Sequence, residues 1–556
     1  MRYVWLLVCW LLFLLQFSTY SATDAFVITR ASSLYQRSIA GYDNLRSVSS
    51  SSSLYAEVEA SPFSRRYLAT CIPGLAPVLA EELEEIHHDI SNIVCSGNAA
   101  VTFHATREAS LHALCWTRTA HRILELVADS SDEMLLYDKH DVHDFFQAAL
   151  TPDKVKSLLG DGQGGLLTMS VKVILNNPRC IPKDLNHSHY TALTIKNAIC
   201  DLVRELHPDG IRPSVDIDDP DVPFVAVLLG HDGRGMDTGA SMALYRSLSP
   251  PSSLHKRGYR NHGPIHKAAM KESLAAGLLR LADFPQQLQE QKSMAVNSDS
   301  HQGKLVIVDP MAGSGSLIIE AALMATDLAP ALMRIKCGLP GHSLPPVVRW
   351  KEPQHQQAGD STETTCLKLW KQILMDATAR AKAGINDVRT NEWVDFHAND
   401  IHDGAVDCLE DSLVQAGLTD LVHVYNQDCY DLELEGNVDS KESPYLVVTN
   451  PPWGVRLTDD VVESWEGLRH FLRDICPKGR TEAWVLSGHK KATAQLKLRR
   501  DKMIPLQTGE QHLRWIQYTI GSPAAAAVHS SSPSAKSTFN DEKAKKPVSA
   551  QQDDAW

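Results

Sequence analysis

The sequence lacks the cysteine patterns that mark zinc and redox proteins. Its eleven cysteines are scattered, with no Cys-x-x-Cys pair and no group of histidines and cysteines at zinc-binding spacing. We therefore interpret them as buried, reduced thiols and predict no bound metal. A positive net charge is absent too. The formal net charge is −13, which excludes a general attraction to polyanions, so any contact with nucleic acid must come from a local basic surface.

The two ends of the chain lack the patterning of a folded domain. Residues 1–25 contain an apolar run that is too short to cross a bilayer comfortably, as in a signal peptide. Residues 26–62 are rich in serine and poor in acids, as transit peptides are. Together they resemble the bipartite presequence of plastid proteins in algae with secondary plastids. This implies a plastid (chloroplast) location and no membrane segment in the mature form, with secretion or another organelle as the alternative. Residues 522–556 have the composition of a disordered tail.

A short apolar run in the middle of the chain ends at a glycine-containing loop. Leu305–Val308 is too short for a helix and suits a strand buried on both faces, as in a parallel sheet. The loop Gly313-Ser314-Gly315 follows, and Ser316 is the expected N-cap of the apolar helix after it. Asp309 stands at the carboxyl end of the strand, where such sheets bind ligands. The spacing is neither that of a dinucleotide loop nor that of a Walker loop, and an ordinary tight turn is the alternative.

A second strand-like run, over 445–449, is stopped by Asn450-Pro-Pro-Trp453. The pairing of Asp309-x-x-x-Gly-x-Gly with a later Asn-Pro-Pro-aromatic motif resembles the S-adenosylmethionine-dependent methyltransferases that modify an exocyclic amine. The resemblance implies S-adenosyl-L-methionine as cofactor. It also implies that Asp309 and the glycine loop face the methionine portion, that Asp400 takes the ribose hydroxyls, and that Asp428 lies near the adenine amino group. A capping role for Asp400 at the next helix is the alternative. The cofactor-binding residues so predicted are Asp309, Gly313, Ser314, Gly315, Asp400 and Asp428.

The same resemblance places the transfer at Asn450, Pro451, Pro452 and Trp453. The Asn450 side-chain oxygen and the Pro451 carbonyl can each accept an N–H hydrogen bond from a guanine amine, which aims the nitrogen lone pair at the methyl group. The two prolines stiffen the loop. Trp453, where the family commonly has Tyr, can stack on a base turned out of its RNA.

The amino-terminal half alternates strand-like and helix-like segments. The expected strands are 66–70, 99–103, 168–173 and 224–229, and the expected helices are 77–85, 109–127 and 190–206. This alternation, without a catalytic constellation, describes an α/β binding module. Two further segments, 286–303 and 351–365, have the composition of surface insertions.

Four segments carry a closer resemblance: 67–77, Arg212-Pro-Ser-Val-Asp216, Asp219-Pro-Asp221 and Leu254-His-Lys-Arg-Gly-Tyr-Arg260. They resemble the THUMP-containing rRNA guanine-N2 methyltransferases, bacterial large-subunit enzymes and their plastid relatives. The resemblance implies an α/β fold: an N-terminal α/β THUMP-containing RNA-binding module over 63–245, and a C-terminal Rossmann-like class I methyltransferase domain over 246–521.

Two basic runs are candidate RNA surfaces. The first is predicted to hold phosphates and a base through His255, Lys256, Arg257, Tyr259 and Arg260. A solvated interdomain linker is the alternative. The second comprises Lys490, Lys491, Lys497, Arg499, Arg500 and Lys502, and a solvated helix face is equally compatible with it.

The predicted function is methylation of N2 of a guanine in plastid large-subunit rRNA, with rRNA as the partner. The alternatives are a tRNA guanine-N2 methyltransferase, a non-catalytic RNA-binding assembly factor, and a protein glutamine methyltransferase. The sequence names neither the target nucleotide nor the oligomeric state.

Overall fold

The computed structural model describes residues 64–130, 134–231, 239–260, 270–297, 303–350, 365–434, 443–453, 459–509 and 511–521. All of them belong to the second of two compact units, which divide between Val58 and Glu59. The predicted presequence and tail lie outside these residues, so the plastid location stays a prediction. Among the described helices, none is alone long and apolar enough to cross a membrane; α9 and α10 (Ser316–Ala325 and Pro330–Lys336) reach that length together only with a 114° bend.

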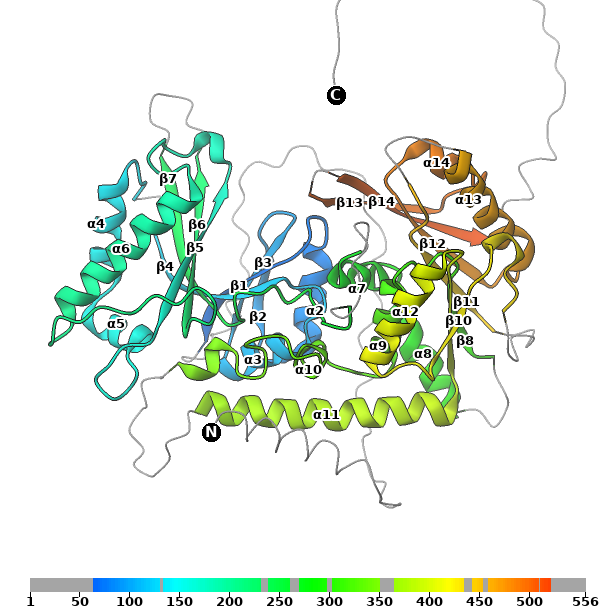
Figure 1. Cartoon of the computed structure of the whole chain (residues 1–556), viewed down its shortest axis with the longest axis horizontal. Coiled ribbons are helices and arrows are strands. Elements are labelled where there is room, and N and C mark those ends of the chain that lie inside the picture. The colour runs from blue at the N-terminus through cyan, green and yellow to red at the C-terminus, as the bar shows by residue number, and fades with distance from the viewer. Residues whose placement is uncertain are drawn as a thin grey trace, which may run out of the picture. The chain divides into compact units, whose positions relative to one another are not determined.

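The amino-terminal half is built on one seven-stranded sheet with the order β2-β3-β1-β4-β7-β6-β5. Only β5 and β6 pair in parallel; the other neighbours are antiparallel. The strands are β1 (Arg65–Thr70), β2 (Ser91–Cys95), β3 (Ala100–Ala105), β4 (Arg122–Asp129), β5 (Met169–Asn176), β6 (Val222–Gly230) and β7 (Ala240–Ser247). Its helices are α2 (Ala76–Ile86), α3 (Arg107–Trp116), α4 (Lys139–Ala149), α5 (Pro152–Leu159) and α6 (Ser188–Leu206), with the short turn η1 (Pro178–Cys180). β4 joins the two parts of this sheet, because it pairs with β1 on one side and β7 on the other (Figure 1).

The carboxy-terminal half holds a second seven-stranded sheet with the order β10-β9-β8-β11-β12-β14-β13. The first five strands are parallel and β14 is antiparallel to its neighbours, as in a doubly wound α/β domain. The strands are β8 (Leu305–Asp309), β9 (Val394–Asn399), β10 (Val422–Tyr425), β11 (Tyr445–Thr449), β12 (Thr481–Ser487), β13 (Lys502–Thr508) and β14 (Gln511–Ile520).

The central strands β8 and β11 are buried at every residue, as expected for a parallel sheet that helices cover on both faces. Besides α9 and α10, the helices are α7 (Glu272–Leu281), α8 (Phe284–Asn297), α11 (Thr365–Asn391), α12 (Asp403–Ala416), α13 (Asp459–His470) and α14 (Lys490–Ala494), with the short turns η2 (Pro346–Arg349), η3 (Cys429–Asp431) and η4 (Phe471–Ile475). The long helix α11 contacts α3 of the amino-terminal half and α9 of the carboxy-terminal half (Figure 1).

Three local predictions are wrong. The segment 109–127 is not one helix, because α3 ends at Trp116 and the β4 residues 122–129 pair in a sheet with buried Ile123 and Leu124. The predicted insertion 286–303 begins within α8. Ser316 is the first residue of α9 and not its N-cap; its hydroxyl donates to the Met270 carbonyl.

Asp219 and Asp221, from one of the segments that carry the family resemblance, bind the chain after α10. Arg349 contacts the carboxylates of Asp219 and Asp221 at 2.7 and 3.2 Å, and the Trp350 indole donates to the Asp221 carbonyl at 2.8 Å. The Arg246 guanidinium lies 3.9 Å from the Trp350 ring centroid. These contacts attach the carboxy-terminal half to β6 and β7.

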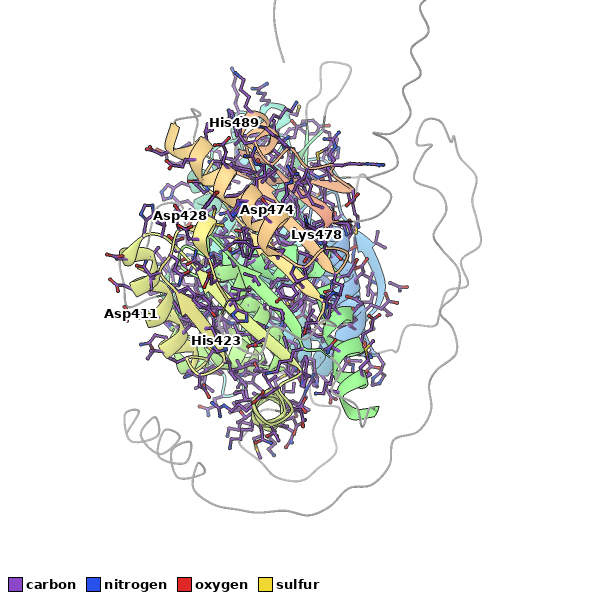
Figure 2. The ribbon with its side chains drawn as sticks, turned by 90° about the vertical axis from the view of Figure 1, so that its right-hand side faces the viewer. Asp411, His423, Asp428, Asp474, Lys478 and His489 are labelled. Carbon is purple, nitrogen blue, oxygen red and sulfur yellow. The ribbon has the colours of Figure 1, made fainter. Side chains whose placement is uncertain are left out.

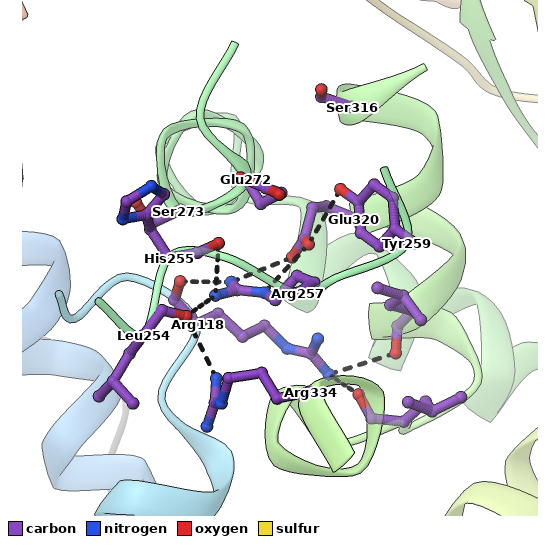
Figure 3. Close-up of polar contacts among 12 residues, drawn as sticks. Arg118, Leu254, His255, Arg257, Tyr259, Glu272, Ser273, Ser316, Glu320 and Arg334 are labelled. Atoms are coloured by element: carbon purple, nitrogen blue, oxygen red, sulfur yellow. Dashed lines mark hydrogen bonds and ion pairs between the residues drawn. The ribbon is translucent and has the colours of Figure 1, made fainter. Parts of the chain in front are cut away.

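The segment 254–260 carries Leu254, Arg257 and Tyr259 into the interior, where Arg257 meets two other buried arginines in one cluster (Figure 3). Arg257 has no exposed surface and forms an ion pair with Glu320 of α9, at 3.2 Å between Nε and Oε1. It also donates to the Arg118 carbonyl of the amino-terminal half. Arg118 in turn donates to the carbonyls of Leu323 and Leu328, near the end of α9, at 3.2 and 2.9 Å. Buried cations are stabilised there because the carboxyl end of a helix carries partial negative charge.

Arg334 completes this cluster by donating to the Leu254 carbonyl at 3.2 Å and the Leu114 carbonyl of α3 at 3.0 Å. Burial, with the nearby charge of Arg257, lowers the pKa of Arg334 to about 9. Burial also raises the pKa of Glu320, while the Arg257 charge opposes that shift. The cluster therefore joins the two halves through buried hydrogen bonds, although Arg118 Nη1 and Arg334 Nε find no partner in the described chain.

The RNA-binding role predicted for Arg257 and Tyr259 is wrong in this structure, since both side chains are buried. Arg260 is half-buried and pairs with Glu272 at 2.7 Å. His255 is also half-buried, and burial next to Lys271 lowers its pKa to about 4, so its ring is neutral at pH 7. Only Lys256 of the five is exposed. The two arginines of this run are thus structural, each paired with an acid from another element.

We predict that Arg257→Met destabilises the chain by about 3–5 kcal/mol, because it leaves the Glu320 carboxylate buried without its partner. Urea unfolding followed by circular dichroism measures this loss. Lys256→Met, on the exposed neighbour, is the control and should change the unfolding free energy by no more than about 0.5 kcal/mol. Equal stability of Arg257→Met and the unmodified chain would contradict a structural role for Arg257.

Candidate functional site

In the second sheet, polar residues lie at or just after the carboxyl ends of four neighbouring strands, and we call this side of the sheet the strand edge. β10, β9, β8 and β11 are consecutive neighbours and run parallel, so their carboxyl ends lie together. Asp309 ends β8, Asp400 follows β9, Asp428 follows β10 and Asn450 follows β11. The sheet thus brings to one edge the residues predicted to bind cofactor and to carry the transfer.

The glycine loop takes the backbone conformation that only glycine adopts freely. Gly313 and Gly315 have φ values of +56° and +76°. At Gly315 a Cβ would also collide with the Leu409 side chain of α12. Ser314, between them, is half-exposed. The Gly313 amide donates to Asp400 Oδ2 at 2.8 Å, so the loop is tied directly to the carboxylate after the neighbouring strand.

Asp400 is a half-buried carboxylate held by two backbone amides. Besides the Gly313 amide, the His402 amide donates to Oδ1 at 3.0 Å. The N-cap of α12 is His402, so the helix-capping alternative does not describe Asp400. A carboxylate has about four acceptor positions. Two remain for other donors, which is what a pair of ribose hydroxyls would need.

Asn399 is a site residue that the sequence reasoning missed. It is almost fully buried, and its Nδ2 donates to the carbonyls of Pro310 and Gln427, both at 3.0 Å. Its Oδ1 accepts from the Gln427 amide at 3.0 Å. The side chain therefore fastens the ends of β8, β9 and β10 to one another. The local signal for it is an amide side chain at the carboxyl end of β9, directly before Asp400.

Asp309 is buried to 1 % exposure, and its Oδ1 accepts from the Met311 amide at 3.3 Å. Burial raises the pKa of Asp309 to about 7, and the negative charge of Asp400 adds to the shift. A cationic group bound beside Asp309 would favour its ionised form.

Asp428 is exposed, and its Oδ1 accepts from the Tyr430 amide at 2.9 Å. Tyr430 stacks on His470 of α13, with 4.0 Å between ring centroids. Asp428 lies on the side of the sheet domain that faces the viewer in Figure 2. Its remaining acceptor positions are open to an amino group, as an adenine would present.

Two indole N–H groups shape the Asn-Pro-Pro-Trp segment. Trp453 Nε1 donates to Asn450 Oδ1 at 2.8 Å, and Trp465 of α13 donates to the Pro452 carbonyl at 2.8 Å. The ring of Trp453 packs against Gly488, where a Cβ would lie 2.6 Å from Cε3. An indole nitrogen only donates, so the Asn450 atom that faces it must be the oxygen. This bond was not foreseen; stacking of Trp453 on a base stays a prediction.

Three residues close enough to share a metal lie elsewhere, directly after α2 and in the first two turns of α3. Ligand atoms of His87, Glu108 and His112 lie within 4.8 Å of one another. Burial lowers the pKa of both imidazoles, which leaves them neutral. However, His87 Nδ1 accepts from the Asp89 amide at 3.1 Å, so the proton of the neutral ring sits on Nε2 and opposes binding of a metal there. We assign no metal to this group.

Three protein-family models match the chain. Residues 257–517 match the model described as RMKL-like, methyltransferase domain. Residues 66–124 match the RlmL ferredoxin-like domain and residues 140–231 the THUMP domain. In the first sheet, β1, β2, β3 and the first residues of β4 lie in the ferredoxin-like match, and β5 and β6 lie in the THUMP match. The second sheet lies within the residues that match the methyltransferase-domain model, apart from the last three residues of β14.

Similar proteins from bacteria carry the name ribosomal RNA large subunit methyltransferase K/L. The protein of Syntrophotalea carbinolica is 28 % identical over 465 residues, which cover 82 % of this chain and 53 % of the relative. That of Allochromatium vinosum is 29 % identical over 464 residues, 82 % of this chain and 51 % of the relative. The chain thus spans about half the length of these relatives.

Solved structures share the fold. A possible methylase from Clostridium difficile superposes with a TM-score of 0.58 at 18 % identity, over 83 % of this chain and 99 % of the other. A putative methyltransferase complexed with SAH has the same TM-score, identity and coverage. At this identity the likeness establishes the Rossmann-like architecture.

We predict that Asp309 makes the folded chain less stable as pH rises. The folded state keeps the Asp309 proton up to about pH 7, whereas the unfolded state loses it near pH 4, so folding becomes less favourable between these values. Relative to Asp309→Asn, which does not titrate, the unfolding free energy should fall by roughly 2–3 kcal/mol from pH 5 to pH 8. Urea unfolding at both pH values measures it. If the difference in unfolding free energy between the unmodified chain and Asp309→Asn does not change with pH, Asp309 titrates normally. The control is Asp411→Asn, on the exposed face of α12.

Proposed function

We propose that this chain, whose methyltransferase domain is RMKL-like and follows a ferredoxin-like and a THUMP domain, methylates N2 of a guanine in large-subunit ribosomal RNA. The methyl donor is S-adenosylmethionine. The names of the curated relatives support rRNA as substrate, and the neighbour complexed with SAH supports the donor. The observation that carries the proposal is the position of Asn450, on the same strand edge as Asp309 and Asp400.

The residues of this edge fit S-adenosylmethionine. Asp400 keeps two acceptor positions for ribose hydroxyls, and exposed Asp428 can accept from an adenine amino group. The Ala312 amide donates to the Asn399 carbonyl at 2.8 Å, so the loop backbone stays close to the end of β9. When bound, S-adenosylmethionine supplies a methyl group attached to a positively charged sulfur.

The Asn450 side chain orients the attacking amine. Its oxygen has two lone pairs; one accepts from Trp453 and the other remains for an N–H of the guanine amine. The Pro451 carbonyl is the second proposed acceptor. Holding both N–H groups aims the nitrogen lone pair away from the acceptors and toward the methyl carbon, and positioning of this kind lowers a barrier by several kcal/mol. With the donor bound, Asn450 and Pro451 would hold the amine nitrogen while it takes the methyl group in place of sulfur, and the amine would then release a proton to solvent.

We predict that Asn450→Ala and Asp400→Ala separate transfer from cofactor binding. Asn450→Ala should lower kcat about 100-fold or more, as loss of a transition-state contact does, and leave the cofactor Kd nearly unchanged. Asp400→Ala should raise the cofactor Kd about 10- to 100-fold, since it removes hydrogen bonds to a charged acceptor. Titration calorimetry and single-turnover transfer of a labelled methyl group measure the two quantities, with Asp411→Ala as control.

The substrate is tested with transcripts of large-subunit rRNA and of tRNA, followed by mass spectrometry of the nucleosides. N2-methylguanosine in rRNA supports the proposal. If only the tRNA is labelled, tRNA and not rRNA is the substrate. If the chain binds the cofactor but labels neither RNA, it is a non-catalytic RNA-binding factor.

We further predict that Trp453 acts on the reaction through Asn450. Trp453→Phe keeps an aromatic ring but loses the N–H that holds Asn450 Oδ1, so kcat should fall about fivefold, as loss of a hydrogen bond of about 1 kcal/mol implies. The KM for RNA should stay nearly unchanged. In the Asn450→Ala background the same substitution should have no further effect, because its target is gone. Additive losses in this double-mutant cycle would contradict the coupling.

A further inference from the structure

The second basic run is exposed, unlike the first. Its six cations lie between the end of β12 and the start of β13, and all six are exposed: Lys490, Lys491, Lys497, Arg499, Arg500 and Lys502. None of them makes an ion pair with any part of the chain that the structure describes. Asp501 is the one acid among them, and its Oδ2 accepts from the Thr519 amide at 2.6 Å. We call these six residues the β12–β13 basic surface.

This surface starts beside the reactive segment. β12 pairs in parallel with β11, with Val485 opposite Thr449, so both strands end at the same edge of the sheet. Gly488, directly after β12, packs against the Trp453 ring, and Lys490 begins α14 two residues later. The basic surface therefore begins one short loop from Asn450.

The first part of this surface is held rigidly. The His489 amide donates to Ser487 Oγ at 3.2 Å, and the Ser487 and Thr493 hydroxyls lie 2.7 Å apart. Arg514 of β14 donates to Thr493 Oγ1 at 3.3 Å. Because these bonds fix α14 to the ends of two strands, the lysines at its start need little ordering before they bind a partner.

We propose that the β12–β13 basic surface binds the phosphate backbone of the RNA next to the methylated nucleotide. The chain as a whole carries a charge of −13 and repels polyanions, so a local set of cations without acidic partners is what phosphate contact requires. Its α14 end, at Lys490 and Lys491, stands beside the site where a base must be presented, and the rest follows the chain to Lys502, which lies across β14 from Trp484. It takes the place of the 255–260 cluster, whose two arginines are paired with Glu320 and Glu272. This inference rests on the proposed function for its choice of RNA over another polyanion.

The test removes two charges at a time and measures binding of a fluorescein-labelled large-subunit rRNA transcript at several salt concentrations. The variants are Lys490→Gln/Lys491→Gln and Arg499→Gln/Arg500→Gln. The matched control is Arg473→Gln/Lys478→Gln, two exposed cations located before β12 and so toward its other end; Figure 2 shows Lys478 well apart from His489.

Each of the two test variants should reduce the slope of log affinity against log salt by about 1.4, as loss of two phosphate contacts to a single strand does. The control should keep the slope of the unmodified chain, and all variants should keep its melting temperature and cofactor Kd. If the slope is unchanged in both test variants while methyl transfer is intact, the RNA-binding role of this surface is wrong and the proposed function stands. A reduced slope without any methyl transfer supports the surface and overturns the proposed function. Displacement of the transcript by polyglutamate of equal charge at equal potency overturns the assignment to RNA.

Discussion

The parallel pairing of β8 with β9 on one side and β11 on the other is the constraint on which the site depends. Val308 lies opposite Val447 and Asp309 opposite Ala398, so the residues that follow these strands emerge together. Because strand side chains alternate between faces, a slip of one residue in either pairing would reverse every buried side chain. The apolar strands thus hold the polar edge in register, and the Gly313–Asp400 hydrogen bond and Asn399 then fasten the loops to it.

The buried arginine cluster holds the two halves of the described chain in a fixed arrangement. Arg118, Arg257 and Arg334 satisfy carbonyls of both halves, and Glu320 compensates one of the charges. Such a junction is costly to open, because each separated group would be left buried without a partner. An RNA held by the amino-terminal half would therefore be presented to the strand edge in a defined orientation, and the β12–β13 basic surface would continue its path beside Trp453.

Local sequence signals predicted the strand edge well and the long-range contacts poorly. Asp309, the glycine loop and Asn450 were recognisable because proline, glycine and an apolar run each act within a few residues. The burial of Arg257 was not, since its partner Glu320 lies within the apolar helix α9 and nothing local couples them. The bond between Trp453 and Asn450 and the role of Asn399 likewise depend on side-chain direction in the folded chain. The strand β4 was mistaken for helix because its pairing partners, β1 and β7, are distant in sequence.

A crystal structure of the chain with S-adenosylhomocysteine tests the central claim most directly. The account predicts ribose hydroxyls on the Asp400 carboxylate, adenine next to Asp428, and the sulfur turned toward the Asn450 oxygen. A ligand bound away from the carboxyl ends of β8 and β9, or a sulfur turned away from Asn450, would contradict it.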